Sequence, residues 1–171
     1  LDACFGLGYN TFSFLEAPAI LGRQVEVFGI EKEPELLSLN HLMEPIYPLW
    51  KDGLKNLRSS AEAVCGAHRV RVEVCGLEEL YRDRGGIMER GLGQDFDLIF
   101  HDAFSTRKCP ELWCVELFSR YRELLRSGGA VITYSSAHPV CAGFIKSGFS
   151  LSTTAAVDRR QGGLLAVNDG M

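Results

Sequence analysis

The chain has 171 residues, of which 46% are hydrophobic and 23% are charged, a balance typical of one globular domain that builds its own core. Eighteen basic and 22 acidic residues give a net charge of −4, which is not the overall basic signature of most nucleic-acid binders. No apolar run approaches the roughly 20 residues needed to span a bilayer, and no signal-peptide pattern is present. We therefore expect a cytoplasmic protein without a membrane partner.

Apolar periodicity and turn residues predict strands and helices in alternation. In chain order we expect a strand end at 1–4, a helix at 11–19, a strand at 24–30, helices at 35–43 and 49–64, a strand at 69–74, a helix at 78–89, a strand at 96–100, a helix at 110–125 capped by Gly128 and Gly129, a strand at 130–134, a helix at 139–146 and a hairpin of 149–157 with 163–167.

This alternation is typical of an α/β fold whose mostly parallel sheet is covered on both faces, with the terminal hairpin adding an antiparallel strand. The pattern shows no linker, so we expect one domain over residues 1–171. Because Leu1 falls inside the first predicted strand, we also expect that strand to be truncated and the N-terminal part of the domain to be missing.

The six cysteines do not form a metal-binding pattern, because none of them stands in a close C-x-x-C pair. The four histidines do not cluster either. We expect reduced, mostly buried thiols and no metal site.

Residues 100–113, with the sequence FHDAFSTRKCPELW, form the most informative stretch. Asp102 follows an apolar strand at 96–100, and ligands of open α/β sheets bind at the carboxyl ends of the strands. The simpler alternative is that Asp102 bonds the backbone of its own turn and that Phe104 packs in the core. The region is also rich in cations, which either face solvent or lie beside the site: Arg107, Lys108, Arg120, Arg122 and Arg126, with Arg159 and Arg160 in a later turn.

The second informative stretch is the glycine loop, residues 2–10, with the sequence DACFGLGYN. Gly6 and Gly8 allow a sharp turn and a close approach to a ligand, although tight turns use glycine for many other reasons. Glu31 ends the next predicted strand, 23 residues after Gly8, at the spacing where an acid accepts hydrogen bonds from ribose hydroxyls. Thr11 stands in place of the third glycine of the dinucleotide fingerprint, which argues against NAD. Together the loop and the acid indicate a cofactor that contains adenosine.

These stretches, with Gly128-Gly129 and Thr133-Tyr134-Ser135 downstream, resemble the methyltransferase domain of the MnmC family of tRNA wobble-uridine enzymes. The resemblance implies a Rossmann-like class I methyltransferase fold with a seven-stranded sheet. It also implies an enzyme that uses S-adenosyl-L-methionine to methylate the amine of 5-aminomethyl-2-thiouridine in tRNA. A FAD-dependent partner domain, fused or separate, and a role in tRNA modification are part of the same expectation.

Residue roles are carried over from the family position by position. The resemblance implies that cofactor binding involves Asp2, Gly6, Leu7, Gly8, Asn10, Glu31, Lys32 and, in place of the family's adenine-site aspartate, Glu78. It implies that the catalytic, methyl-acceptor side of the site is formed by Asp102, Phe104, Ser105 and Tyr134.

Two alternatives remain open from the sequence. A small-molecule methyltransferase or aminopropyltransferase has the same fold and type of cofactor, and the acidic composition suits it better. A non-catalytic relative that only binds is the third possibility, because fold alone does not determine function.

Overall fold

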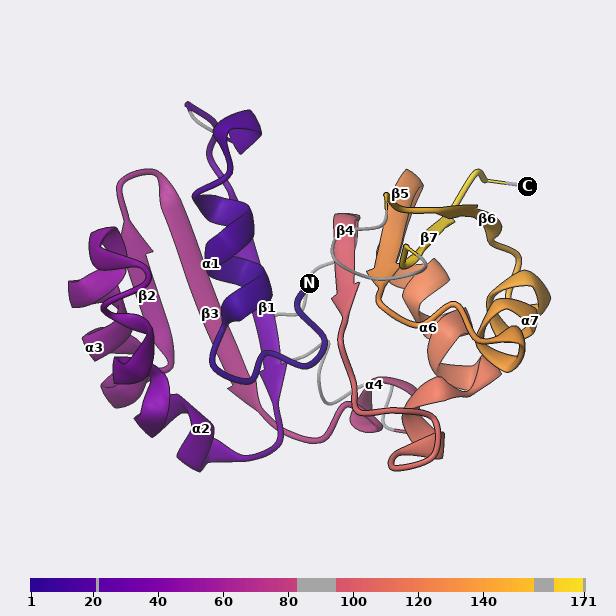
Figure 1. Cartoon of the computed structure of the whole chain (residues 1–171), viewed down its shortest axis with the longest axis horizontal. Helices are drawn as coiled ribbons and strands as arrows, with labels where there is room; N and C mark the ends of the chain where they lie inside the picture. The colour runs from indigo at the N-terminus through magenta and orange to yellow at the C-terminus, as the bar shows by residue number, and fades with distance from the viewer. Residues whose placement is uncertain (21, 83–94, 156–161, 171) are drawn as a thin grey trace. The chain divides into compact units, whose positions relative to one another are not determined.

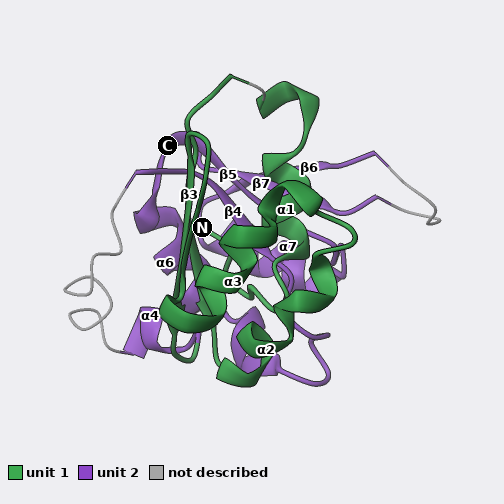
Figure 2. Cartoon of the chain, turned by 90° about the vertical axis from the view of Figure 1, so that its left-hand side faces the viewer, with its two compact units in different colours: residues 1–76 green, residues 77–171 purple. Residues whose placement is uncertain are grey.

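The structure is a computed structural model that describes residues 1–20, 22–82, 95–155 and 162–170. It divides into two compact units, unit 1 from Leu1 to Gly76 and unit 2 from Leu77 to Met171 (Figure 2). Each unit contains a sheet and its helices. Among the described residues, no helix is both long and apolar enough to cross a membrane.

Unit 1 is built on a three-stranded sheet in the order β1-β3-β2 (Figure 1). β1 and β3 are parallel, and β2 joins the outer side of β3 in antiparallel pairing. The bounds are α1 Tyr9–Leu15, a 3-10 turn Pro18–Ile20, β1 Glu26–Glu31, α2 Pro34–Ser38, 3-10 turns Leu39–Met43 and Pro48–Trp50, α3 Lys51–Ser60, β2 Glu62–Cys65 and β3 His68–Val74.

The core of unit 1 is aromatic. Phe12 is fully buried and packs against the rings of Phe5, Tyr47 and Trp50, with ring centroids 5.2–6.2 Å apart. Leucines from α3 and valines from β3 complete this cluster. Burial of these large side chains fixes α1 and the segment that precedes it against the sheet.

Unit 2 is built on a four-stranded sheet in the order β4-β5-β7-β6. β4 and β5 are parallel, and the final hairpin is antiparallel, as expected. The bounds are α4 Glu79–Arg82, β4 Phe96–His101, a 3-10 turn Pro110–Trp113, α6 Val115–Leu124, β5 Leu125–Thr133, α7 His138–Lys146, β6 Ser150–Thr153 and β7 Leu164–Val167. Phe118 of α6 stacks on Phe144 of α7 at 3.8 Å between ring centroids.

The predicted single seven-stranded sheet is wrong for this structure, because the strands form a three-stranded and a four-stranded sheet. Residues 1–4, predicted as the end of the first strand, pair with β1 only through a single parallel bridge between Asp2 and Gly29. One bridge is too short to form a regular strand. The prediction of one domain over 1–171 stays a prediction.

Several predicted boundaries also differ. The helix predicted at 49–64 ends at Ser60, where Ala61 adopts a left-handed φ of 57°, and β2 follows. The helix predicted at 110–125 is interrupted at Cys114, which has an extended backbone. Gly128 and Gly129 do not cap a helix but lie inside β5. The predicted helix at 78–89 is described only as far as Arg82.

Candidate functional site

The glycine loop of unit 1 turns the chain from Asp2 into α1. Gly6 and Gly8 both have left-handed backbones, with φ of 57° and 87°, and Gly8 is the N-cap residue of α1. The Gly8 N–H donates to the Phe5 carbonyl at 2.8 Å, which closes the turn. Both positions favour glycine, because any other residue would be strained in a left-handed backbone conformation.

The space beside the two glycines differs. A Cβ at Gly6 would meet no atom within 4 Å, whereas a Cβ at Gly8 would lie 2.4 Å from the Phe12 ring and 2.9 Å from the Phe5 ring. Position 8 therefore has no room for a side chain, because the rings of Phe12 and Phe5 fill the space beside it. Gly6 is the position in the loop that leaves open space for a ligand.

Glu31 lies at the carboxyl end of β1 and is 8% exposed. Its Oε2 accepts the Gly6 N–H at 2.7 Å and its Oε1 accepts the Glu33 N–H at 2.9 Å. Each carboxylate oxygen has two acceptor sites, so one on each remains for a further donor such as a ribose hydroxyl. The structure thus places the predicted ribose acid directly on the predicted glycine loop.

The other predicted cofactor residues have mixed surroundings. Asp2 is fully buried and accepts the Thr11 hydroxyl at 2.7 Å, which braces the loop against α1. Leu7 and Asn10 are half-buried and Lys32 is exposed. Glu78 belongs to unit 2, where it is half-buried in the turn before α4.

In unit 2 the four predicted methyl-acceptor residues lie at the ends of two neighbouring strands. His101 of β4 is in register with Thr133 of β5, so Asp102 and Tyr134 leave the same edge of the sheet. We call residues 102–105 the acceptor loop. Tyr134 donates its hydroxyl to the Ala103 carbonyl of this loop at 3.1 Å.

The acceptor loop presents the side chains of Asp102, Phe104 and Ser105 to solvent, whereas Ala103 is buried. Asp102 and Ser105 are exposed, and Phe104 is 69% exposed, so the alternative that Phe104 packs in the core is wrong. The Lys108 ammonium lies 5.4 Å from the centre of the Phe104 ring, within the range of a cation–π contact. An exposed aromatic ring and a cation therefore lie together here, and an exposed carboxylate precedes the ring by two residues.

The remaining cations differ in their surroundings. Arg120 pairs with Glu123 at 2.7 Å, and Arg126 pairs with Asp97 at 2.6 Å. Arg107 is exposed. The predicted turn with Arg159 and Arg160 lies outside the described residues.

Two residues beneath the acceptor loop were not identified from the sequence as part of a site. Trp113 donates its indole N–H to the Phe104 carbonyl at 2.7 Å. His101 is fully buried and its Nδ1 lies 2.8 Å from the Tyr121 hydroxyl. Burial lowers the pKa of His101 to about 3, an effect that the backbone of Leu112 partly offsets, so the imidazole is neutral near pH 7. For His101, the sequence offered one indication of a special role: it is a polar residue at the end of an apolar strand.

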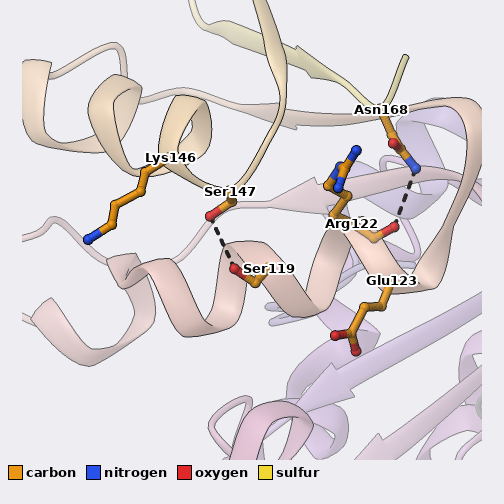
Figure 3. Close-up of a pocket in the computed structure, with 6 residues that line it drawn as sticks. All are labelled: Ser119, Arg122, Glu123, Lys146, Ser147 and Asn168. Carbon is orange, nitrogen blue, oxygen red and sulfur yellow. Dashed lines mark hydrogen bonds between the residues drawn. The ribbon is translucent and has the colours of Figure 1, made fainter. Parts of the chain in front are cut away.

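A separate hollow of about 410 Å³ in unit 2 is shown in Figure 3. Its lining residues are polar, and none of them is a predicted site residue: Ser119, Arg122, Glu123, Lys146, Ser147 and Asn168. Asn168 uses its Nδ2 to bond carbonyls at the end of α6, among them Leu125 at 3.1 Å, and Ser147 bonds the Gly143 carbonyl at 2.9 Å. These polar groups therefore stabilise the fold around the hollow.

The residues of unit 1 fit an adenosine-containing cofactor. The open space at Gly6 admits a ligand close to the backbone, and the acceptor sites left on Glu31 suit the two hydroxyls of a ribose.

In the described residues, no group of three or more histidines, cysteines or acids is placed to hold a metal ion. The six cysteines are free thiols, of which Cys75 is buried and five are partly exposed, so the expected burial of most thiols is wrong.

Known proteins resemble this chain along most of its length. A 169-residue alignment with an uncharacterized protein of Methanocaldococcus jannaschii shows 24% identity and covers 97% of this chain but 45% of that protein. The chain thus spans about half the length of this relative.

Two solved structures share the fold. The crystal structure of MnmC2 from Aquifex aeolicus matches with a TM-score of 0.71 and 24% identity, over 96% of this chain and 51% of that one. A methyltransferase from Pyrococcus furiosus matches with a TM-score of 0.58 and 17% identity, over 98% of this chain and 73% of that one.

The family model for S-adenosyl-L-methionine-dependent methyltransferases matches residues 41–169. This range contains the acceptor loop, Trp113 and Tyr134, and it is most of the chain. The family expected from the sequence motifs is thereby confirmed, and so is the cofactor that this family uses. The chain belongs to the S-adenosyl-L-methionine-dependent methyltransferase family.

Proposed function

We propose that the chain transfers the methyl group of S-adenosyl-L-methionine to the primary amine of 5-aminomethyl-2-thiouridine at the wobble position of tRNA. The observation that carries the proposal is the acceptor loop, where the exposed Phe104 ring lies 5.4 Å from the Lys108 ammonium and exposed Asp102 stands two residues before Phe104. The proposed partners are tRNA and a FAD-dependent domain, fused or separate, and the proposed location is the cytoplasm.

The surface suits a nucleotide better than a small free amine. Single-stranded bases are bound by stacking on aromatic side chains, and nearby cations hold the phosphates. Phe104 offers a ring that is 69% exposed, and Lys108 and Arg107 supply positive charge within four residues of it. A solvated cluster of charges alone would not require the exposed phenylalanine, which gives up the stabilisation that burial of its ring would provide.

The transfer itself needs positioning more than acid–base power. The amine nitrogen forms a bond to the methyl carbon while the carbon–sulfur bond breaks, and the bonding pair stays on sulfur to give S-adenosylhomocysteine. The product ammonium then loses a proton to solvent. Asp102 accepts a hydrogen bond from the amine, directs its lone pair and assists the departure of the proton.

On the cofactor side, Glu31 would accept hydrogen bonds from the ribose hydroxyls, and the backbone around Gly6 would contact the methionine part. Asp2 braces the loop through Thr11. Leu7, Asn10, Lys32 and Glu78 remain proposed contacts.

Methyl transfer assays on two kinds of acceptor test the function. Bulk tRNA that lacks the terminal wobble methyl group and a panel of small primary amines receive labelled cofactor, with fully modified tRNA as the control. We expect label in the under-modified tRNA alone, and loss of that label with Phe104→Ala.

Two other outcomes would each contradict the proposal. Transfer to small amines only would identify a small-molecule methyltransferase, which the net charge of −4 favours. Binding of S-adenosylhomocysteine without transfer to any acceptor would identify a non-catalytic relative.

A further inference from the structure

We propose that Trp113 is a positioning residue for the methyl-acceptor side of the site, because its indole N–H fixes the backbone of the loop that carries Asp102. This inference rests on the proposed function, and it concerns unit 2 alone.

The acceptor loop is held through two successive carbonyls. Trp113 donates to the Phe104 carbonyl at 2.7 Å, and Tyr134 donates to the Ala103 carbonyl at 3.1 Å. The rings of Trp113 and Tyr134 also touch edge to face, with centroids 5.9 Å apart and planes at 85°. The loop is thus fixed by two side chains that support each other and come from different parts of the chain.

The Trp113 ring is itself supported by buried residues of β4 and α6. Its ring packs edge to face on the His101 ring at 4.5 Å between centroids, and His101 bonds the Tyr121 hydroxyl at 2.8 Å. His101 and Tyr121 are fully buried, so this support is rigid. A continuous set of contacts therefore runs from α6 through β4 to the Phe104 carbonyl.

The backbone and the side chain of Phe104 have different surroundings, and this difference supports a positioning role for Trp113. Its carbonyl is bonded to the 8% exposed Trp113, whereas its side chain is 69% exposed. The indole N–H of Trp113 thus restrains the backbone of the loop and leaves the Phe104 ring free to face solvent. Because Asp102 lies two residues before the held carbonyl, a shift of the loop backbone also moves the group that orients the amine.

The variant that tests the inference is Trp113→Phe, which keeps an aromatic ring at this position and removes the N–H donor together with the pyrrole part of the indole. We expect kcat for methyl transfer to fall about tenfold, since one hydrogen bond that fixes the reacting geometry is lost. The KM for S-adenosyl-L-methionine should stay unchanged. We also expect faster amide hydrogen exchange across residues 102–105.

The matched control is Tyr47→Phe. It removes a part-buried hydrogen bond of an aromatic side chain, the 2.6 Å contact with Ser13, and both residues belong to unit 1 rather than to the acceptor loop. Its kcat should equal that of the unchanged protein. Trp113→Phe combined with Tyr134→Phe should reduce kcat by less than the product of the two single effects, because both side chains hold the same loop.

Two results would overturn the inference. The first is a Trp113→Phe variant with full kcat and only a lower thermal midpoint, which would make Trp113 a core residue. The second is unchanged hydrogen exchange at residues 102–105. Because exchange is measured without substrate, it tests positioning even where no acceptor is methylated, so a failure of the proposed function is distinguished from a failure of this inference.

Discussion

The Glu31 carboxylate and the Gly6 N–H, 25 residues apart in the chain, form a hydrogen bond of 2.7 Å. The acid that ends β1 therefore shapes the glycine loop as well as offering acceptor sites to a ribose. The structural role of Glu31 is thus shown, and its proposed role in ribose binding is tested by the variant below.

Replacement of Glu31 with alanine should weaken cofactor binding by roughly 2–4 kcal/mol, because charge-assisted bonds to the ribose are lost and the Gly6 N–H loses its partner. Isothermal titration with S-adenosylhomocysteine measures the change. Glu33→Ala is the matched control, since the Glu33 side chain is exposed and only its backbone bonds Glu31. Equal affinity for Glu31→Ala and the unchanged protein would show that Glu31 does not contact the cofactor.

Asp102→Asn should reduce methyl transfer by about 100-fold while leaving cofactor affinity and thermal stability nearly unchanged. Asparagine can make the same turn bonds but lacks the charge that helps the amine proton leave. Asp97→Asn, a change at an exposed carboxylate of β4, is the control for a lost surface charge. Full activity in Asp102→Asn would remove Asp102 from the site.

The two loop glycines should respond differently to alanine. Gly8→Ala should lower the free energy of unfolding by roughly 2–5 kcal/mol, because a left-handed backbone and a clash with the Phe12 ring add together. Gly6→Ala should lower it by only about 1–2 kcal/mol, the cost of the backbone alone. Urea unfolding measures both, and equal losses would contradict the packing role of Gly8.

His101 should make unit 2 less stable in acid. Its pKa is lowered from 6.5 in the unfolded chain to about 3 in the folded one, so its contribution to stability is complete above pH 6.5 and is lost as the pH falls toward 3. Across that range the loss should be on the order of a few kcal/mol. His101→Gln, which cannot take up a proton, should show a shallower decline in the free energy of unfolding. Identical pH profiles would show that His101 is not buried as a neutral group.

The parts of the fold that the sequence predicted well are those where one short pattern determines the outcome. β1, β3 and β4 follow runs of apolar or alternating residues, and Pro34 begins a helix as expected. β2 was missed because helical apolar spacing continues past Ser60, and only the left-handed Ala61 ends the helix. Alanine gives no signal of such a turn.

The same holds for the site. Glycines and acids at strand ends are visible in a sequence, so Gly6, Glu31 and Asp102 were identified as candidates. Trp113 and His101 were not assigned a role, because their contacts depend on tertiary packing and no spacing rule encodes them. The open space beside Gly6 and the filled space beside Gly8 likewise follow from where Phe5 and Phe12 pack.

The two bonds that hold the acceptor loop differ in the length of chain they close. The Trp113 bond spans nine residues, whereas the Tyr134 bond spans 31 and follows the pairing of β4 with β5. Short loops close at a lower entropic cost and sooner than long ones. We therefore expect residues 102–113 to gain their shape as a local unit before the sheet of unit 2 is complete, and Tyr134 to dock later on a loop that is already formed.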